Sequence, residues 1–184
     1  MLKLTATAIC LALALTGIAG CGKKSPEPKP LDQTSATDSG QPTPPPTLPP
    51  EVRQRNEAGV KATVEAFVEA WNYAANTGQT ERLEELFTGS CLKCIGAVRT
   101  AHKTYANGGR FENSDWKIDR FVFKGFEEGT AFVEIYVSYG ASRYLASANA
   151  SPEAYPPGDN VIHFVQLEWH RTKGWLVKAL DPEP

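Results

Sequence analysis

Two cysteines are the residues of this chain whose types and spacing could most directly do chemistry. Cys91 and Cys94 stand three residues apart in "SCLKC", and the 184-residue chain has two other cysteines. A pair at this spacing can supply half of a zinc site, act as a redox centre, or form a structural disulfide. The choice among these three depends on the ligands available elsewhere in the chain and on the compartment in which the protein works.

The other residues of the chain favour the disulfide. Zinc needs about four ligands, and the histidines, His102, His163 and His170, have neither a second CxxC motif nor an H-x₃₋₅-H spacing to support them. A thioredoxin-type centre opens a helix that follows a strand, whereas this pair follows an expected helix. Outside the cytoplasm two cysteines this close are oxidised. We therefore expect a disulfide and no metal, with zinc and redox roles as the alternatives.

The first twenty residues have the pattern of an export signal. Lys3 is followed by the uncharged run "LTATAICLALALTGIAG" and then by "CGKK". A short positive start, an apolar core and small residues at the end are typical of a secretory signal peptide. A retained transmembrane helix is the alternative, but a run that ends in Thr, Gly and Ala without an aromatic belt disfavours it. We expect residues 1–20 to be a signal peptide.

The end of this run, "IAGC" at residues 18–21, resembles the bacterial lipobox. The resemblance implies cleavage before Cys21, a diacylglyceryl thioether on its sulfur and acylation of its new amino group. Two or more acyl chains, at about 0.8 kcal/mol per buried methylene, make such an anchor stable. The resemblance to the lipobox therefore implies a protein that is anchored by lipid on the outer face of the cytoplasmic membrane. Cys10 would be discarded with the signal, leaving Cys91 and Cys94 as the free thiols.

Residues 21–50 have the composition of a stalk. The segment 22–50 holds nine of the chain's 14 prolines and almost no large apolar side chain. Such a segment cannot build a core and is typical of a spacer that is partly polyproline and partly flexible. The run "PTPPPTLPP" also suits aromatic peptide-binding grooves, which is the alternative interpretation. In an exported lipoprotein we expect the spacer.

Residues 51–184 have the pattern of one globular domain. They carry 15 Lys and Arg against 18 Asp and Glu, a net charge of −3 with no basic run, which disfavours a nucleic-acid partner. Apolar residues recur at helical spacing and then, beyond Gly109, at a spacing near two. This order predicts an α+β fold with three helices followed by about four antiparallel strands. The expected helices cover residues 60–78, 80–87 and 90–109, and the expected strands 116–126, 130–140, 161–171 and 175–180, with a loop over 141–160.

The folded part resembles a known family. The segments "AFVEAWNYAANTGQTERLEELFTGSCLKC" and "AHKTYANGGRF" carry the resemblance to actinobacterial lipoproteins with domain of unknown function 6318. The residues that matter most are Trp71, Asn72, Tyr73, Thr77, Gly78, Cys91, Cys94, Tyr105, Gly108 and Gly109. The element order resembles the nuclear-transport-factor-2-like (cystatin-like) cone, which implies a curved sheet wrapped around the helices, often with a pocket. The resemblance implies no reaction.

Several side chains could do chemistry inside such a cone. The candidates for acid–base catalysis are placed on strands and at a hairpin: His163, Glu134, Asp119, Tyr136 and His170. A pocket would be lined by His163, Glu134, Tyr136 and Trp71. A satisfied core histidine and an exposed hairpin residue are the ordinary explanations for His163 and His170. The chain has no nucleophile motif, phosphate loop or metal triad.

The sequence therefore predicts a binding function. We expect a lipid-anchored domain that binds an envelope protein or a small ligand without a cofactor and without catalysis. A membrane-tethered enzyme with a polar pocket in the cone is the alternative. A homodimer is a further expectation, because related folds often pair through the open face of the sheet.

Overall fold

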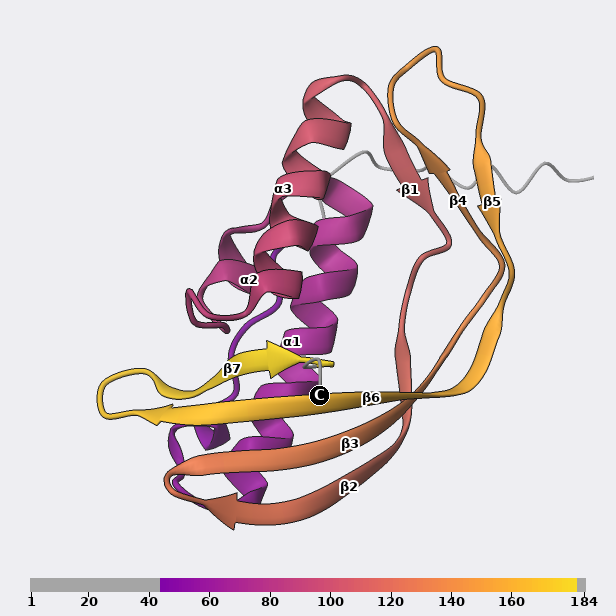
Figure 1. Cartoon of the computed structure of the whole chain (residues 1–184). Coiled ribbons are helices and arrows are strands. Elements are labelled where there is room, and N and C mark those ends of the chain that lie inside the picture. Colours follow the sequence, from indigo (N-terminus) through magenta and orange to yellow (C-terminus); the bar gives the residue numbers. More distant parts are fainter. Residues whose placement is uncertain (1–43, 182–184) are drawn as a thin grey trace, which may run out of the picture. The chain divides into compact units, whose positions relative to one another are not determined.

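The computed structural model describes residues 44–181 (Figure 1). The signal peptide expected over residues 1–20, the lipidated residue Cys21 and the stalk up to residue 43 lie outside this range. The packed structure begins slightly before Glu51, because Leu48 packs against the core and η1 (Pro50–Arg53) is a 3₁₀ helix. No helix between residues 44 and 181 is long and apolar enough to cross a membrane.

The first long helix, α1 (Glu57–Thr77), forms where the sequence predicts it. At its start the Asn56 side chain accepts a hydrogen bond from the Gly59 N–H at 2.9 Å, which is a typical N-cap. At its end Gly78 has a φ of 76°, and a Cβ there would lie 2.4 Å from the Tyr105 ring. Only glycine fits both this left-handed backbone and this close approach.

Two further helices follow. The second, α2 (Glu81–Glu84), is a single turn and therefore shorter than predicted. Thr80 precedes it but does not cap it, because its hydroxyl donates to Glu84 Oε1 at 2.6 Å. The third, α3 (Leu92–Ala106), begins directly after Cys91 and ends before the two glycines, as expected.

The four predicted strands form one antiparallel sheet in the order β2, β3, β6, β7. Their bounds are β2 (Lys117–Glu127), β3 (Thr130–Tyr139), β6 (Gly158–His170) and β7 (Gly174–Leu180). Figure 1 shows these strands crossing α1, which lies against one face of the sheet. The α+β architecture and the order of helices before a curved antiparallel sheet are confirmed.

The prediction of about four strands and of a loop over residues 141–160 is wrong. Three short strands, β1 (Arg110–Glu112), β4 (Ser142–Leu145) and β5 (Glu153–Tyr155), form a second antiparallel sheet in the order β1, β4, β5. The rings of Phe111 and Tyr144 stack across β1 and β4 with their centroids 5.0 Å apart. Strands of three or four residues are too short to show a period in the sequence, which is why they were missed.

The core lies between α1 and the inner face of the four-stranded sheet. Along β3 the side chains of Ala131, Val133, Ile135 and Val137 are at most 2% exposed. In the register of β3 and β6, His163 pairs with Ile135. Directly paired residues lie on the same face of the sheet, so His163 faces inward with Ile135. Because side chains alternate between the two faces of a strand, the residues between these inward-facing ones face outward.

Candidate functional site

The cysteine pair forms the disulfide that the sequence favours. Cys91 and Cys94 are bonded with their Cα atoms 5.3 Å apart, and both are at most 1% exposed. Cys91 is the N-cap residue of α3, and its carbonyl accepts from the Ile95 N–H at 3.0 Å. The bond fixes the first turn of α3 after the loop from α2. Both sulfur atoms are used in it, so neither is a thiolate ligand.

Two of the residues predicted to line a pocket face away from the core, which corrects that prediction. Glu134 and Tyr136 lie on β3 between the buried Val133, Ile135 and Val137 and therefore project from the opposite face. The Glu134 carboxylate forms an ion pair with the Lys124 amine at 3.0 Å. The Arg120 guanidinium lies 3.5 Å from the centre of the Tyr136 ring. These two residues belong to the outer face of the sheet and cannot share a pocket with a side chain on the inner face.

Two more acid–base candidates lie apart from the cone interior. Asp119 on β2 lies 3.8 Å from the Lys117 amine. His170, at the end of β6, lies 2.8 Å from Glu168 and has a side chain that is 43% exposed. Within residues 44–181 neither has a hydrogen bond or ion pair to His163. The structure therefore does not assemble the five candidates into one site.

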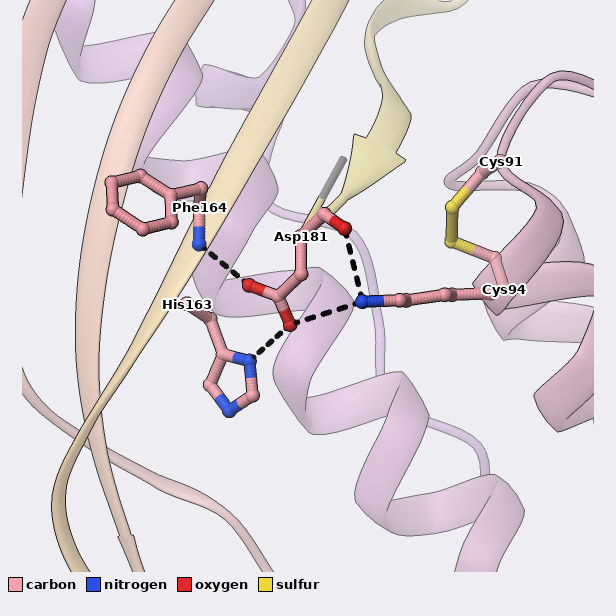
Figure 2. A network of polar contacts seen from close by, with 6 residues as sticks. Cys91, Cys94, His163, Phe164 and Asp181 are labelled. Carbon is pink, nitrogen blue, oxygen red and sulfur yellow. Dashed lines mark hydrogen bonds and ion pairs between the residues drawn. A yellow bond between two sulfur atoms is a disulfide. The ribbon is translucent and has the colours of Figure 1, made fainter. Parts of the chain in front are cut away.

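His163 does face inward, and it meets a carboxylate that the sequence did not suggest. Figure 2 shows its Nδ1 directed at the Asp181 side chain, whose Oδ2 lies 2.6 Å away. Asp181 Oδ1 accepts from the Phe164 N–H at 2.8 Å, and the Lys93 amine donates to the Asp181 carbonyl at 2.9 Å. Lys93 stands between the two bonded cysteines, so the disulfide-bonded turn and the end of β7 are joined at Asp181.

The backbone of Asp181 is unusual. Its φ of 43° lies in the left-handed region, which Asp tolerates better than most residues but at some cost. No motif in "WLVKALD" marks this residue. The register of the β6–β7 hairpin is the one feature that indicates its position. Val165 on β6 pairs with Leu180 on β7, so Asp181, which follows Leu180, lies next to Phe164 and His163.

Trp116 joins His163 to helix α1. Its ring stacks on the imidazole with centroids 4.4 Å apart and lies 5.4 Å from the ring of Trp71. The Asn72 side-chain amide makes two hydrogen bonds to the Trp116 backbone. It donates to the carbonyl at 2.8 Å and accepts from the N–H at 2.9 Å. Trp71 and His163, both predicted to line a pocket, thus both contact the Trp116 ring.

Two cavities adjoin this aromatic group. The first, of about 310 Å³, lies between the three helices and the segment 111–116. It is lined by Trp71, Ala74, Ala75, Thr80, Leu83, Ala97, Thr100, Ala101, Phe111, Ser114 and Trp116. The second, also about 310 Å³, is lined by Ser114, Trp116, Tyr139, Ser142, Tyr155, Pro156, Pro157 and His163. Ser114 and Trp116 belong to both walls.

Among the described residues two buried polar atoms at these walls have no hydrogen-bond partner, Ser114 Oγ and His163 Nε2. Residues 44–181 contain no group of three or more His, Cys, Asp and Glu that could hold a metal ion. The side chains at the two cavities can therefore offer aromatic faces, hydroxyl groups and one imidazole.

Comparison with known proteins finds solved structures of low sequence identity and one sequence family. No curated protein matches the sequence. Among solved structures, a nuclear transport factor 2-like superfamily protein from Salmonella enterica is 13% identical, with 70% of this chain and 95% of that chain covered and a TM-score of 0.45. An uncharacterised protein with a cystatin-like fold from Caulobacter vibrioides is also 13% identical, with 66% and 83% covered and a TM-score of 0.43. Aln2 from a Streptomyces species is 10% identical, with 68% and 90% covered and a TM-score of 0.44.

The family comparison extends over most of the chain. Residues 32–179 match the family described as "Family of unknown function (DUF6318)". This range includes the disulfide, α1 and β6, the strand that carries His163. The chain belongs to the DUF6318 family.

Proposed function

We propose that this protein is a lipid-anchored envelope protein whose domain binds a small apolar molecule in the first cavity, without catalysing a reaction. The observation that carries this proposal is the lining of that cavity. Its wall is formed by indole, phenyl and aliphatic side chains, interrupted by the hydroxyl groups of Thr80, Thr100 and Ser114. Mainly apolar walls with a few polar groups are typical of small-molecule sites.

The size of the cavity limits the ligand. A volume of about 310 Å³ is at the lower end of the range for ligand sites, which is roughly 300–1,000 Å³. The cavity suits a compact molecule of one or two rings better than a long acyl chain. The absence of charged side chains from its wall favours a neutral ligand, because burial of an unpaired charge is costly.

The binding proposal is tested with a variant that fills the cavity. Ala97 lines the cavity from α3, and Ala106 on the same helix is exposed and does not line it. By calorimetry, naphthalene and indole should bind the wild-type domain and bind at least about tenfold more weakly to Ala97→Phe, while Ala106→Phe binds as the wild type does. Equal binding by the two variants would contradict the proposal.

The cellular location is proposed from the sequence pattern. The "IAGC" segment and the proline-rich residues 22–50 support a lipid anchor on Cys21 with a spacer between membrane and domain. Cys21→Ala should move the protein from the membrane fraction to the soluble fraction in the natural host and abolish labelling by a clickable fatty acid. Ser25→Ala, a few residues away, is the control and should leave both unchanged.

The enzyme alternative has one observation in its favour. A histidine paired with a carboxylate at 2.6 Å beside a cavity is an arrangement that can move protons. Glu134 and Tyr136 cannot assist it, because they lie on the other face of the sheet. We propose binding as the main function and keep proton transfer at His163 as the second candidate.

The homodimer stays a prediction. On the outer face of the sheet Ile162 is 47% exposed and Phe164 is 52% exposed, so this face offers apolar surface to a partner. Sedimentation of the wild-type domain and of Ile162→Glu over a range of concentrations tests the prediction. A monomer at all concentrations in the wild type would contradict it.

A further inference from the structure

We infer that His163, oriented by Asp181, is the hydrogen-bond acceptor of a second binding site, which takes a neutral phenol in the cavity lined by Trp116, Tyr139 and Tyr155. This site is distinct from the cavity of the proposed function, although the two share part of their walls. The inference does not depend on whether the first cavity binds a ligand.

The contacts of Asp181 determine which nitrogen of His163 carries the proton. A carboxylate only accepts hydrogen bonds, and Asp181 already accepts from the Phe164 N–H at Oδ1. The 2.6 Å contact between Oδ2 and His163 Nδ1 therefore requires the proton on Nδ1. In the neutral imidazole the other nitrogen, Nε2, then holds a lone pair and can accept a hydrogen bond.

The accepting nitrogen has no partner within residues 44–181, and it is covered from solvent. A buried polar atom without a partner is costly, so it favours any group that can satisfy it. The His163 side chain forms part of the wall of the second cavity, and its ring plane is fixed by the stack on Trp116. Because Nε2 is covered, we expect a small shift of a neighbouring wall side chain when a ligand donates to it.

The wall of the cavity indicates the class of ligand. Besides His163, the lining consists of aromatic rings, two prolines and two serine hydroxyls, and none of these side chains is charged. Aromatic and proline faces suit a planar ring, and a lone-pair acceptor suits one acidic O–H group. An anion is disfavoured, because the Asp181 carboxylate lies directly behind the imidazole. A neutral phenol meets all three conditions.

Few titratable groups among residues 44–181 lie near His163. The titratable groups near it are Asp181 from the end of β7, Lys93 from α3, which lies 3.8 Å from Asp181 Oδ2, and the phenols of Tyr139 and Tyr155 at the cavity wall. At about pH 8 free phenol still holds its proton, so the ligand can donate a hydrogen bond to His163 Nε2.

The experiment compares phenol with anisole by calorimetry at about pH 8. Anisole has the same ring but no O–H, so the wild-type domain should bind phenol at least about tenfold more tightly. In Asp181→Asn the Phe164 N–H holds the amide oxygen, which turns the amide N–H toward His163 Nδ1 and moves the imidazole proton to Nε2. The preference for phenol should then disappear, and nitrogen-15 NMR of the ring should report the changed tautomer.

Controls keep the result interpretable. Asp119→Asn removes an exposed carboxylate and should leave the preference unchanged, and His163→Phe keeps a stacking ring and should bind both probes equally. In Ala97→Phe, which fills the first cavity, the preference should persist. The inference is overturned if the wild type binds phenol and anisole equally or binds neither, if Asp181→Asn keeps the preference, or if Ala97→Phe loses it.

Discussion

Two regions along the same sheet are built differently. In one region α1 closes the inner face completely, and Phe67, Val133 and Leu167 are at most 2% exposed. In the other region the inner face carries His163 and meets Trp116, beside two cavities. The closed region is apolar and tightly packed and stabilises the fold, whereas the open region combines aromatic rings with polar groups and has room for a molecule.

The largest expected effect on stability comes from truncating one phenylalanine in each region. Phe67→Ala in the closed region should lower the free energy of unfolding by about 3–5 kcal/mol, because the core around it cannot collapse. Phe111→Ala in the open region should cost about 1 kcal/mol, mostly the stack on Tyr144. Urea unfolding measures both. Equal losses would mean that the open region is as tightly packed as the core.

The disulfide gives the next largest effect. Cys91 and Cys94 close a loop with a sequence separation of 3, so their bond should contribute about 2 kcal/mol by restricting the unfolded chain. The double variant Cys91→Ala/Cys94→Ala should unfold at correspondingly lower urea concentration. Reduction of the wild type with dithiothreitol should reproduce the loss, and reduction of the variant should change nothing. An unaltered midpoint in both experiments would argue against a stabilising role.

The sequence predicted the closed region better than the open one. The periods of residues 60–78 and 130–140 directly reflect burial against a continuous apolar layer, so the helix and the strand were found. The same alternation in β3 already separates Glu134 and Tyr136 from the buried valines, but it does not say which face a pocket would use. The pocket residues Glu134 and Tyr136 were therefore misplaced.

The missing parts of the site depend on contacts distant in sequence. Asp181 reaches His163 only because of the β6–β7 register, which contains an irregularity between Gln166 and Leu167 that no local pattern predicts. Trp71 and His163 were selected as candidates from their own segments. The residue that connects them, Trp116, is placed by a side chain 44 positions away, that of Asn72.

That long-range contact provides the third test. Asn72→Ala removes two hydrogen bonds and leaves the Trp116 N–H and carbonyl without their partner, which should cost about 1–3 kcal/mol. It should also weaken phenol binding, because Trp116 forms part of the cavity wall. Asn76→Ala is the matched control on the same helix, since it loses one exposed hydrogen bond to Asp115 and should have little effect on either. Similar results for the two variants would mean that Asn72 does not position Trp116.

The smallest expected effect concerns the second sheet, which borders the open region. Hydrogen bonding from Arg110, with further help from the nearby Arg143, holds the pKa of Glu112 below its ordinary value. A carboxyl group whose pKa is lower in the folded state than in the unfolded state stabilises the fold above its unfolded pKa and loses this contribution as the pH falls through its folded pKa. The contribution of Glu112 should therefore be present at neutral pH and vanish in acid, over a range that ends below its ordinary pKa.

A comparison of glutamine variants measures this contribution. Thermal unfolding should show Glu112→Gln less stable than the wild type at about pH 7 and closer to it at about pH 3, because acid protonates the Glu112 carboxylate. Glu127→Gln, at the exposed end of β2, should show a smaller difference between the two pH values. A difference between Glu112→Gln and the wild type that is the same at both pH values would mean that Glu112 acts through its shape and not its charge. The second sheet would then be held beside the open region by side-chain packing alone, in the same way that α1 is held against the core.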